Sequence, residues 1–241
     1  MDEPTISLSR GYEKRVLIME FESLYSHRFA IEILKSVPEL STLWSEILQA
    51  VSEVSEDEVA SVHNDINNSG EITKSLSKAI NFLLDDRLTK LDWTPQTNLF
   101  SALGYNGKNE SAWTLDFSKS VSRPDGSISG LAIEVAFNHG EAAAWNLMKP
   151  VLAAEVNYLP KQVDIGEGVG IVIVASQGLK EKGAFDGAVG TYDRYVKHLR
   201  AMRTHLTTPL LIASIAPPKN YFVKPVKVEG SRSKRGEIVY Y

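Results

Sequence analysis

The residue with the clearest potential for chemistry is Glu134, an acid inside the apolar run LAIEVAF at 131–137. Side chains alternate along a β-strand, so Glu134 shares a face with Ala132 and Ala136 and points away from Ile133 and Val135. Two interpretations fit this pattern: an exposed acid on an edge strand, or an acid that lines a cleft. The residue by itself favours the first.

A second acid is expected to face Glu134 across a hairpin. The segment RPDGS at 123–127 has the residues of a tight turn, because proline presets one backbone dihedral and glycine supplies a positive φ. A hairpin centred on Asp125 places Asp116 opposite Glu134, with Cβ atoms roughly 5 Å apart on one face. Two carboxylates this close repel each other unless a cation lies between them. The pair therefore predicts a site for Mg²⁺, which prefers oxygen ligands.

Asp125 is the alternative partner, because it follows Pro124 and lies closer to Glu134 in the sequence. An aspartate in such a turn is also explained by hydrogen bonds to its own backbone. We therefore prefer Asp116 as the metal-binding aspartate.

The elements that position this hairpin are predicted from apolar spacing and turn residues. Helices are expected over residues 16–36, 43–53, 73–91, 141–159 and 191–205, and strands over 112–122, 128–137, 169–175 and 210–215. Residues 54–72 and 177–190 are predicted as loops. This order indicates one α/β domain in which helices cover both faces of a sheet. Its parts are a mainly helical region (1–110), an α/β core (111–216) and basic C-terminal strands (217–241).

Composition excludes several other kinds of site. The 241 residues include no cysteine, so disulfides, thiolate metal sites and a cysteine nucleophile are ruled out. The histidines form no helical pair at zinc spacing, and GEGVG at 166–170 precedes a strand instead of following one, so no nucleotide cofactor is expected. No apolar run reaches the roughly 20 residues of a membrane helix, and no signal-peptide core is present. We expect a cytoplasmic protein without a membrane partner.

Charge is distributed unevenly along the chain. The net charge is −4, from 26 basic and 30 acidic residues, and the first hundred residues carry most of the acidic excess. The last 25 residues are basic, with Lys219, Lys224, Lys227, Arg232, Lys234 and Arg235. A basic tail on an acidic body suits a polyanion held by one local surface, although a solvated tail explains the charges equally well.

Three short segments together resemble the PD-(D/E)XK nucleases, and among them the BglII/BstYI group of type II restriction endonucleases. The first comprises Tyr25-Ser26-His27 and LWSEI at 43–47. The second is Asp116-Phe117 followed by Ala132-Ile133-Glu134-Val135, which is similar to the active-site hairpin of that group. The third is KRGEIVYY at 234–241. The segments occur in the same order as in the family and span nearly the whole chain.

The resemblance implies a central mixed β-sheet flanked by helices, the restriction-endonuclease-like core. It also implies a homodimer that cuts a short palindromic site in double-stranded DNA and depends on Mg²⁺. By the same resemblance, Asp116 and Glu134 would bind the metal, with the Val135 carbonyl as a further ligand. The metal would lower the pKa of a water that attacks phosphorus.

The main departure from the family is Ala136. In the family the residue two positions after the glutamate is Lys, Glu or Gln and orients the attacking water, which a methyl group cannot do. Three interpretations remain open: an inactivating substitution, a third catalytic residue that has migrated elsewhere, or a protein that binds DNA without cutting it. Glu141 and Lys149 are the candidates for migration, although ordinary helix-surface charges are the simpler interpretation of both.

The resemblance also indicates residues that would contact DNA. Asn138 and His139 correspond to family positions at base edges, and asparagine can read adenine. Asp186, Gly187 and Ala188 fall in a second recognition loop, while Arg232, Lys234 and Arg235 would hold phosphates. A helix cap at Asn138, a plain connector at 186–188 and a solvated tail are the simpler alternatives.

Two other functions remain possible at this stage. A DNA-binding protein of the same fold without catalysis would explain Ala136. An α/β domain that binds a different kind of ligand would explain the acidic net charge.

Overall fold

A computed structural model of the chain describes residues 17–101, 104, 113–137, 139–155 and 158–241. At its centre lies a six-stranded sheet in the order β1-β6-β5-β4-β3-β2. The strands are β1 (Phe21–His27), β2 (Thr94–Asn98), β3 (Thr114–Ser122), β4 (Ile128–Val135), β5 (Val169–Ala175) and β6 (Leu210–Ile215). β4, β5 and β6 run parallel and the other neighbours run antiparallel, which confirms the predicted mixed sheet.

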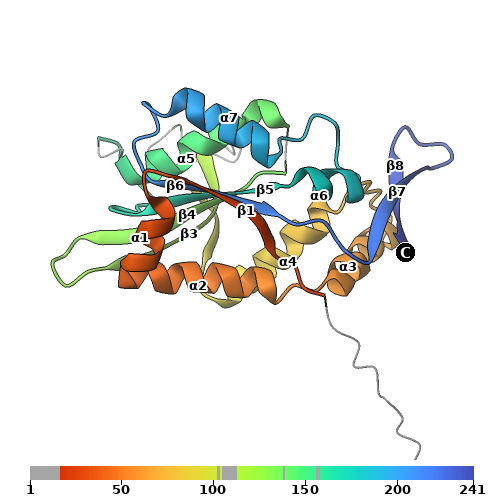
Figure 1. The fold of residues 1–241 in the computed structure, drawn as a ribbon, viewed down its shortest axis with the longest axis horizontal. Coiled ribbons are helices and arrows are strands. Elements are labelled where there is room, and N and C mark those ends of the chain that lie inside the picture. Colours follow the sequence, from red (N-terminus) through yellow and green to blue (C-terminus); the bar gives the residue numbers. More distant parts are fainter. Residues whose placement is uncertain (1–16, 102–103, 105–112, 138, 156–157) are drawn as a thin grey trace, which may run out of the picture.

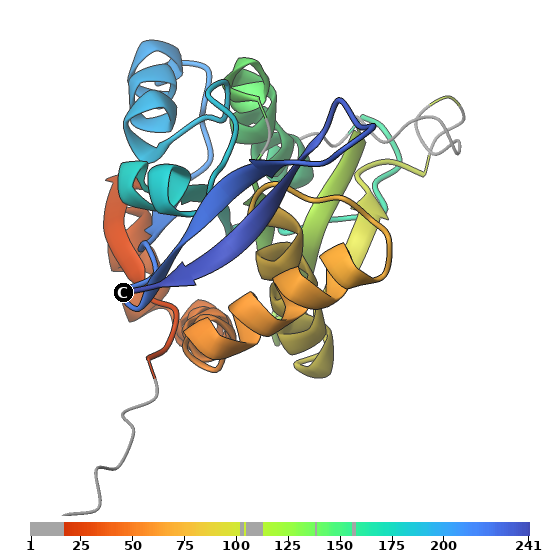
Figure 2. The ribbon, with the colours of Figure 1, turned by 90° about the vertical axis from the view of Figure 1, so that its right-hand side faces the viewer.

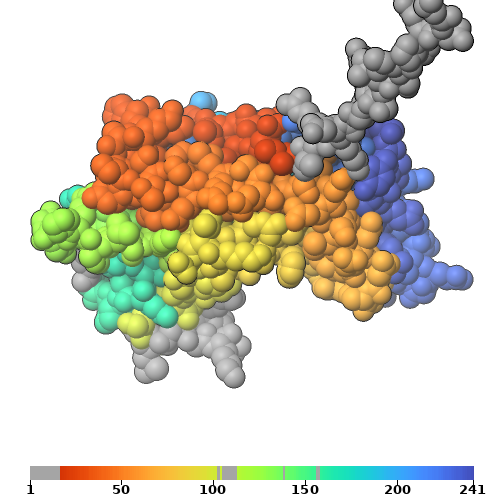
Figure 3. All heavy atoms as spheres, turned by 90° about the horizontal axis from the view of Figure 1, so that it is seen from below, coloured from red at the N-terminus to blue at the C-terminus, as the bar shows by residue number. Residues whose placement is uncertain are grey.

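Helices cover both faces of the sheet, as predicted (Figure 1). One face packs against α1 (Ala30–Ser36), α2 (Pro38–Ser52) and α4 (Ser77–Lys90), and the other against α5 (Ala143–Glu155) and α7 (Tyr192–Met202). Along β5, Ile171 and Ile173 belong to the first core and Val172 and Val174 to the second. A strand covered on both faces needs an unbroken apolar sequence, which explains the run VGIVIVA. Figure 3 views the face formed by α2 and α4.

The C-terminal residues form a separate hairpin of β7 (Tyr221–Lys227) and β8 (Lys234–Tyr240). It packs beside α3 (Glu56–Asn68) and α6 (Gln177–Lys182), and Figure 2 shows it crossing that end of the molecule. Gly236 lies at the contact: its N–H donates to Thr73 O at 2.9 Å, and His63 Nε2 lies 3.0 Å from its carbonyl oxygen. A Cβ at position 236 would lie 2.2 Å from Lys74 O, so only glycine fits here.

The prediction of one helix over residues 16–36 is wrong for its first half. Residues 21–27 form β1, an edge strand paired with β6, and only residues 30–36 are helical. The helix predicted over 43–53 starts earlier, because Pro38 begins α2. Proline suits the first helical position because its missing N–H would lack a partner there in any case.

Several further boundaries also differ from the prediction. Residues 54–72 are mostly helical: Ser55 caps α3 through the Glu58 N–H, and the Glu58 carboxylate accepts from the Ser55 N–H. This reciprocal pair is a capping box. The predicted loop 177–190 begins with α6, β2 was not predicted, and α4 begins after Leu76 instead of at Thr73. Within the described ranges, no helix is long and apolar enough to cross a membrane.

Candidate active site

The β3–β4 hairpin has the register predicted from its turn. Phe117 pairs with Ile133 and Ser122 with Ile128, so the hairpin is centred on Asp125. Asp125 itself lies in the turn, where its Oδ1 accepts the Ser127 N–H at 2.9 Å. The hydrogen bonds from Ser127 hold the pKa of Asp125 below its ordinary value. Asp125 therefore has the structural role in the turn that its sequence context favoured.

Asp116 lies where the regular pairing of β3 stops. The ladder with β4 ends at Phe117 and Ile133, one pair before Asp116 and Glu134. Leu115 and Phe117 belong to different cores although they are two residues apart, so β3 is irregular at Asp116. Such irregularities re-aim side chains and are common beside active sites. The Asp116 carboxylate turns toward β4, and its Oδ2 accepts the Val135 N–H at 2.7 Å.

Gln96 holds the other oxygen of the same carboxylate. It lies opposite Asp116 in the register of β2 with β3, and its carboxamide donates to Asp116 Oδ1 at 2.8 Å. The backbone of Gln96 is left-handed, with φ of 45°. That conformation is costly for a residue with a Cβ. In this conformation the neutral carboxamide of Gln96 lies against the Asp116 carboxylate.

Glu134 is buried, with 3% of its surface exposed. Its Oε2 accepts from Lys149 Nζ at 2.7 Å, and Lys149 also donates to Thr114 O at 2.8 Å. The other oxygen, Oε1, is buried without a hydrogen-bond partner in the described part of the chain. A buried carboxylate oxygen without a partner is unfavourable unless a cation or donor completes it.

The charge of Asp116 acts on Glu134. Burial and, to a smaller extent, the neighbouring Asp116 carboxylate raise the pKa of Glu134, which reaches about 8. The Lys149 ammonium lowers the pKa but does not compensate fully. Because its pKa is raised, the charged form of Glu134 is disfavoured beside Asp116, and a second cation would stabilise it.

These residues fit a divalent ion on oxygen ligands. Asp116 and Glu134 offer carboxylates and Val135 offers a main-chain carbonyl, the donor types that Mg²⁺ prefers. Within the residues that the structure describes, no group of three or more acidic or histidine side chains is placed to hold a metal. Water and substrate oxygens would complete the coordination, as is usual for Mg²⁺.

A cleft opens beside Asp116. It is lined by Asn81, Phe82, Asp85, Gln96, Asp116, Phe117 and Val135. The α4 side chains that line this cleft could not be recognised from the sequence as part of a site, because they lie on the solvent side of an ordinary amphipathic helix. Phe82 is exposed although it is a large apolar residue.

Ala136 is buried, and of the two candidates for a migrated catalytic residue only Glu141 is the surface charge expected from the sequence. Ala136 is buried in the core shared by α5 and β5, beside residues such as Ala143 and Leu147. Glu141 is exposed, in the short 3-10 helix Gly140–Ala142, as expected of a surface charge. Lys149 is buried against Glu134, so its interpretation as a helix-surface charge is wrong. The available signal was a charged residue within the apolar stretch LMKPVLAA of α5.

The two segments expected to read bases lie side by side. His139 forms a β-bridge with Val189, and the Gly140 N–H donates to Ala188 O at 2.8 Å. His139, Asp186, Gly187 and Ala188 are all exposed, and Asp186 pairs with Lys74. Asn138 lies outside the described residues. Two segments almost fifty residues apart thus form one surface.

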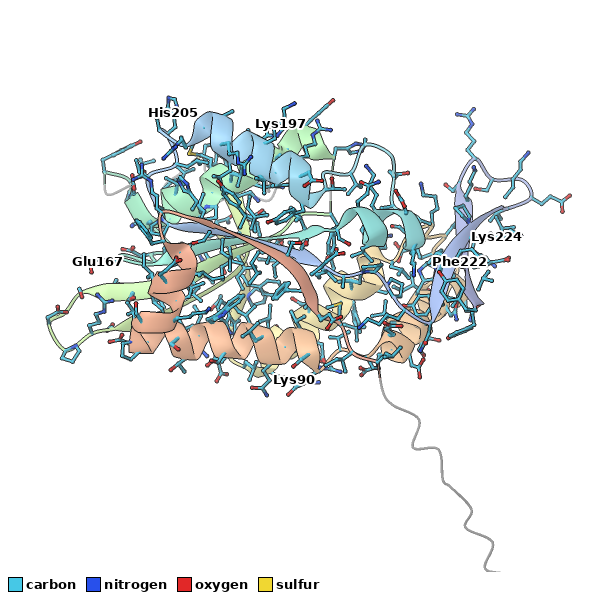
Figure 4. All side chains as sticks on the ribbon, in the orientation of Figure 1. Lys90, Glu167, Lys197, His205, Phe222 and Lys224 are labelled. Carbon is cyan, nitrogen blue, oxygen red and sulfur yellow. The ribbon has the colours of Figure 1, made fainter. Side chains whose placement is uncertain are left out.

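The residues expected to hold phosphates lie farther away, on the β7–β8 hairpin. Arg232 and Lys234 are exposed near its tip, and Arg235 is half-buried. Figure 4 shows Lys224 and Phe222 on this hairpin, at the opposite end of the molecule from Glu167.

Comparisons with known proteins give one matching family model and two similar solved structures. The model of the restriction endonuclease BglII/BglIII family matches residues 23–215. A crystal structure of restriction endonuclease BglII complexed with a DNA 16-mer is similar, with a TM-score of 0.53 and 16% identity over 91% of this chain and 99% of that chain. A structure of free BglII gives a TM-score of 0.38 and 12% identity, over 91% and 98%. A comparison with curated protein sequences gives no significant match.

Proposed function

The chain belongs to the BglII/BglIII restriction endonuclease family, and on that premise we propose that it cuts a short palindromic site in double-stranded DNA by Mg²⁺-dependent hydrolysis. The observation that carries the proposal is the meeting of Asp116 and Glu134 where β3 and β4 separate. Two acids held so close, one with a buried oxygen that lacks a partner among the described residues, are poorly explained by stability alone. They are well explained by a metal.

Asp116, Glu134 and the Val135 carbonyl would hold the ion. When bound, it would activate a water and stabilise the charge that develops on the phosphate. The protein's own contribution is to fix the carboxylates: Gln96 and the Val135 N–H orient Asp116, and Lys149 orients Glu134. Fixed donors and charges lower the barrier because they need no reorganisation during the reaction.

We propose that the DNA lies across the cleft and the exposed surface formed by His139 and residues 186–188. Asn138, His139 and Asp186 would read base edges, with Gly187 and Ala188 allowing a close approach. Arg232, Lys234 and Arg235 would contact phosphates and supply affinity without sequence specificity. The solved BglII complex with a DNA 16-mer supports this class of ligand.

A palindromic site is best matched by a two-fold symmetric protein, so we propose a homodimer. Sedimentation should then give twice the 26.7 kDa of one chain. A monomer at micromolar concentration, with and without DNA, would contradict this part of the proposal.

Cleavage is tested by incubating the protein with plasmid and phage DNA in MgCl₂. Discrete fragments are expected, and the variants Asp116→Asn and Glu134→Gln should each lose at least about 100-fold in rate, the order that a removed charge-stabilising group costs. Loss of cleavage in EDTA and its return with Mg²⁺ would support the metal requirement. Cleavage that survives both substitutions would refute the assigned site.

The alternative, a protein that binds DNA without cutting it, is favoured by the buried methyl of Ala136. The variant Ala136→Gln separates the two functions. Cleavage by the parent protein supports an active nuclease, whereas cleavage by Ala136→Gln alone identifies an inactivated one. If neither cuts but both shift duplex DNA in a salt-dependent manner, DNA binding without catalysis is the function.

A further inference from the structure

Lys149 is the one buried lysine of helix α5, and its surroundings are unusual for a lysine. Its side chain is 10% exposed and lies among apolar residues of α5. Lysines are rarely buried this deeply unless they are paired. Both of its hydrogen bonds reach out of the helix, to the two strands that carry Asp116 and Glu134.

Lys149 contacts both of these strands near the point where their pairing stops. Its Nζ donates to Glu134 Oε2 on β4 at 2.7 Å and to Thr114 O on β3 at 2.8 Å. Thr114 is two residues before Asp116. The ammonium thus fixes one carboxylate directly and anchors it to the strand of the other. Glu134 Oε1 has no partner in the part of the chain that the structure describes.

The fold brings α5 close enough for this contact. Gly170 of β5 faces Pro150, the residue after Lys149, and a Cβ on Gly170 would lie only 2.4 Å from the Pro150 Cβ. Ala153, one turn further along, is also buried against the sheet. Small residues at these positions let the helix lie close to β4 and β5, so that the lysine reaches the carboxylate.

We propose that Lys149, on helix α5, is the positioning residue of this site. It holds Glu134 so that one oxygen is engaged and the other is presented to a divalent ion. The proposal rests on the function proposed above. Partners that orient a metal-binding carboxylate typically contribute about 10–100-fold to metal affinity or activity.

The test measures Mn²⁺ binding by isothermal titration and uses Lys149→Met, which keeps the length of the side chain. We expect Mn²⁺ to bind about 10–100-fold more weakly and cleavage to slow by a similar factor. The matched control is Lys119→Met. Lys119 is also partly buried and ion-paired, with Glu46, but is not in contact with Asp116 or Glu134. Its loss should leave Mn²⁺ affinity within about threefold of the parent, even if the protein melts earlier.

The outcomes separate this inference from the proposed function. If Glu134→Gln weakens Mn²⁺ binding and a folded Lys149→Met protein does not, Lys149 has no positioning role and the metal site stands. If Lys119→Met weakens Mn²⁺ as strongly as Lys149→Met, the effect is general destabilisation and the inference fails. If Glu134→Gln leaves Mn²⁺ binding unchanged, the metal site itself is wrong. Should Lys149→Met not fold, Lys149→Gln, which keeps one donor, replaces it under the same criteria.

Discussion

At the scale of single residues, the two acids of the site are held by different means. Asp116 is held by two neutral donors, the Gln96 carboxamide and the Val135 N–H. Glu134 is held by one cation and is otherwise desolvated. The two carboxylates therefore lie in unlike environments, and only Glu134 is fixed by a charged partner.

The raised pKa of Glu134 predicts that stability falls as pH rises. With a folded-state pKa of about 8 against an ordinary 4.5, the folded protein binds this proton more tightly than the unfolded chain. The stability that the proton contributes is complete below pH 4.5 and is lost by about pH 8. Thermal unfolding in EDTA should therefore show Glu134→Gln melting progressively above the parent over this range. We expect a relative gain of at least about 2–4 °C, the shift produced by 1 kcal/mol. A difference in melting temperature between Glu134→Gln and the parent that does not change with pH would contradict the raised pKa of Glu134.

Gln96 predicts a separation between stability and function. Gln96→Gly removes the carboxamide but suits the left-handed backbone, so stability should stay within about 1 kcal/mol of the parent. Gln96→Ala removes the same group and keeps the strain, so it should be the less stable variant. Both should cleave about tenfold more slowly, because Asp116 loses a positioning contact. Urea unfolding and single-turnover cleavage measure the two effects. Full activity in either folded variant would show that Gln96 does not orient Asp116.

At the scale of elements, the features that could be predicted are those fixed by local sequence. The turn at 123–127 defines the centre of the hairpin, and with it the neighbourhood of Asp116 and Glu134. The apolar runs of β5 and β6 define two buried strands. The contact between Lys149 and Glu134 could not be predicted in this way, because it depends on how closely α5 approaches the sheet.

Two of the differences from the predicted elements have clear physical reasons. Residues 16–36 contain no glycine or proline, and their apolar residues fit helical spacing as well as alternation, so pairing with β6 decides the structure of β1. In residues 54–72 the acidic composition suggested a loop. The Ser55–Glu58 capping box and the pairing of Glu58 with Arg87 on α4 instead stabilise a helix.

The capping box gives a prediction about α3. Ser55→Ala removes the side chain that accepts the Glu58 N–H and should cost about 1 kcal/mol, lowering the melting temperature by roughly 2–4 °C. The matched control is Ser69→Ala at the other end of the same helix, where the hydroxyl is exposed and bonds to Ile66 O. That change should cost less than about 0.5 kcal/mol. Equal losses from the two substitutions would show that the box does not stabilise α3.

At the scale of the whole molecule, an acidic body carries a basic hairpin, and we propose that this hairpin supplies the attraction for DNA. The net charge of −4 works against DNA, so the attraction has to come from local surfaces. The tip of the β7–β8 hairpin is one such surface, because Arg232 and Lys234 are exposed there. The hairpin is fixed to the body by the contacts of Gly236 with His63 and Thr73, which give its charges a defined position.

This division predicts how affinity depends on salt. Arg232→Ala and Lys234→Ala should each weaken binding to specific and random duplexes by similar factors, and each should reduce the slope of log K against log salt by about 1. Glu229→Ala at the same exposed tip is the opposite control, because removing an acid should strengthen binding. Fluorescence anisotropy across a salt series measures all three. If the two basic substitutions leave the slope of log K against log salt unchanged, the hairpin does not contact phosphates. Its basic residues then serve only to keep the hairpin hydrated. If they weaken one duplex sequence alone, the hairpin reads bases, and specificity is not confined to the surface formed by His139 and residues 186–188.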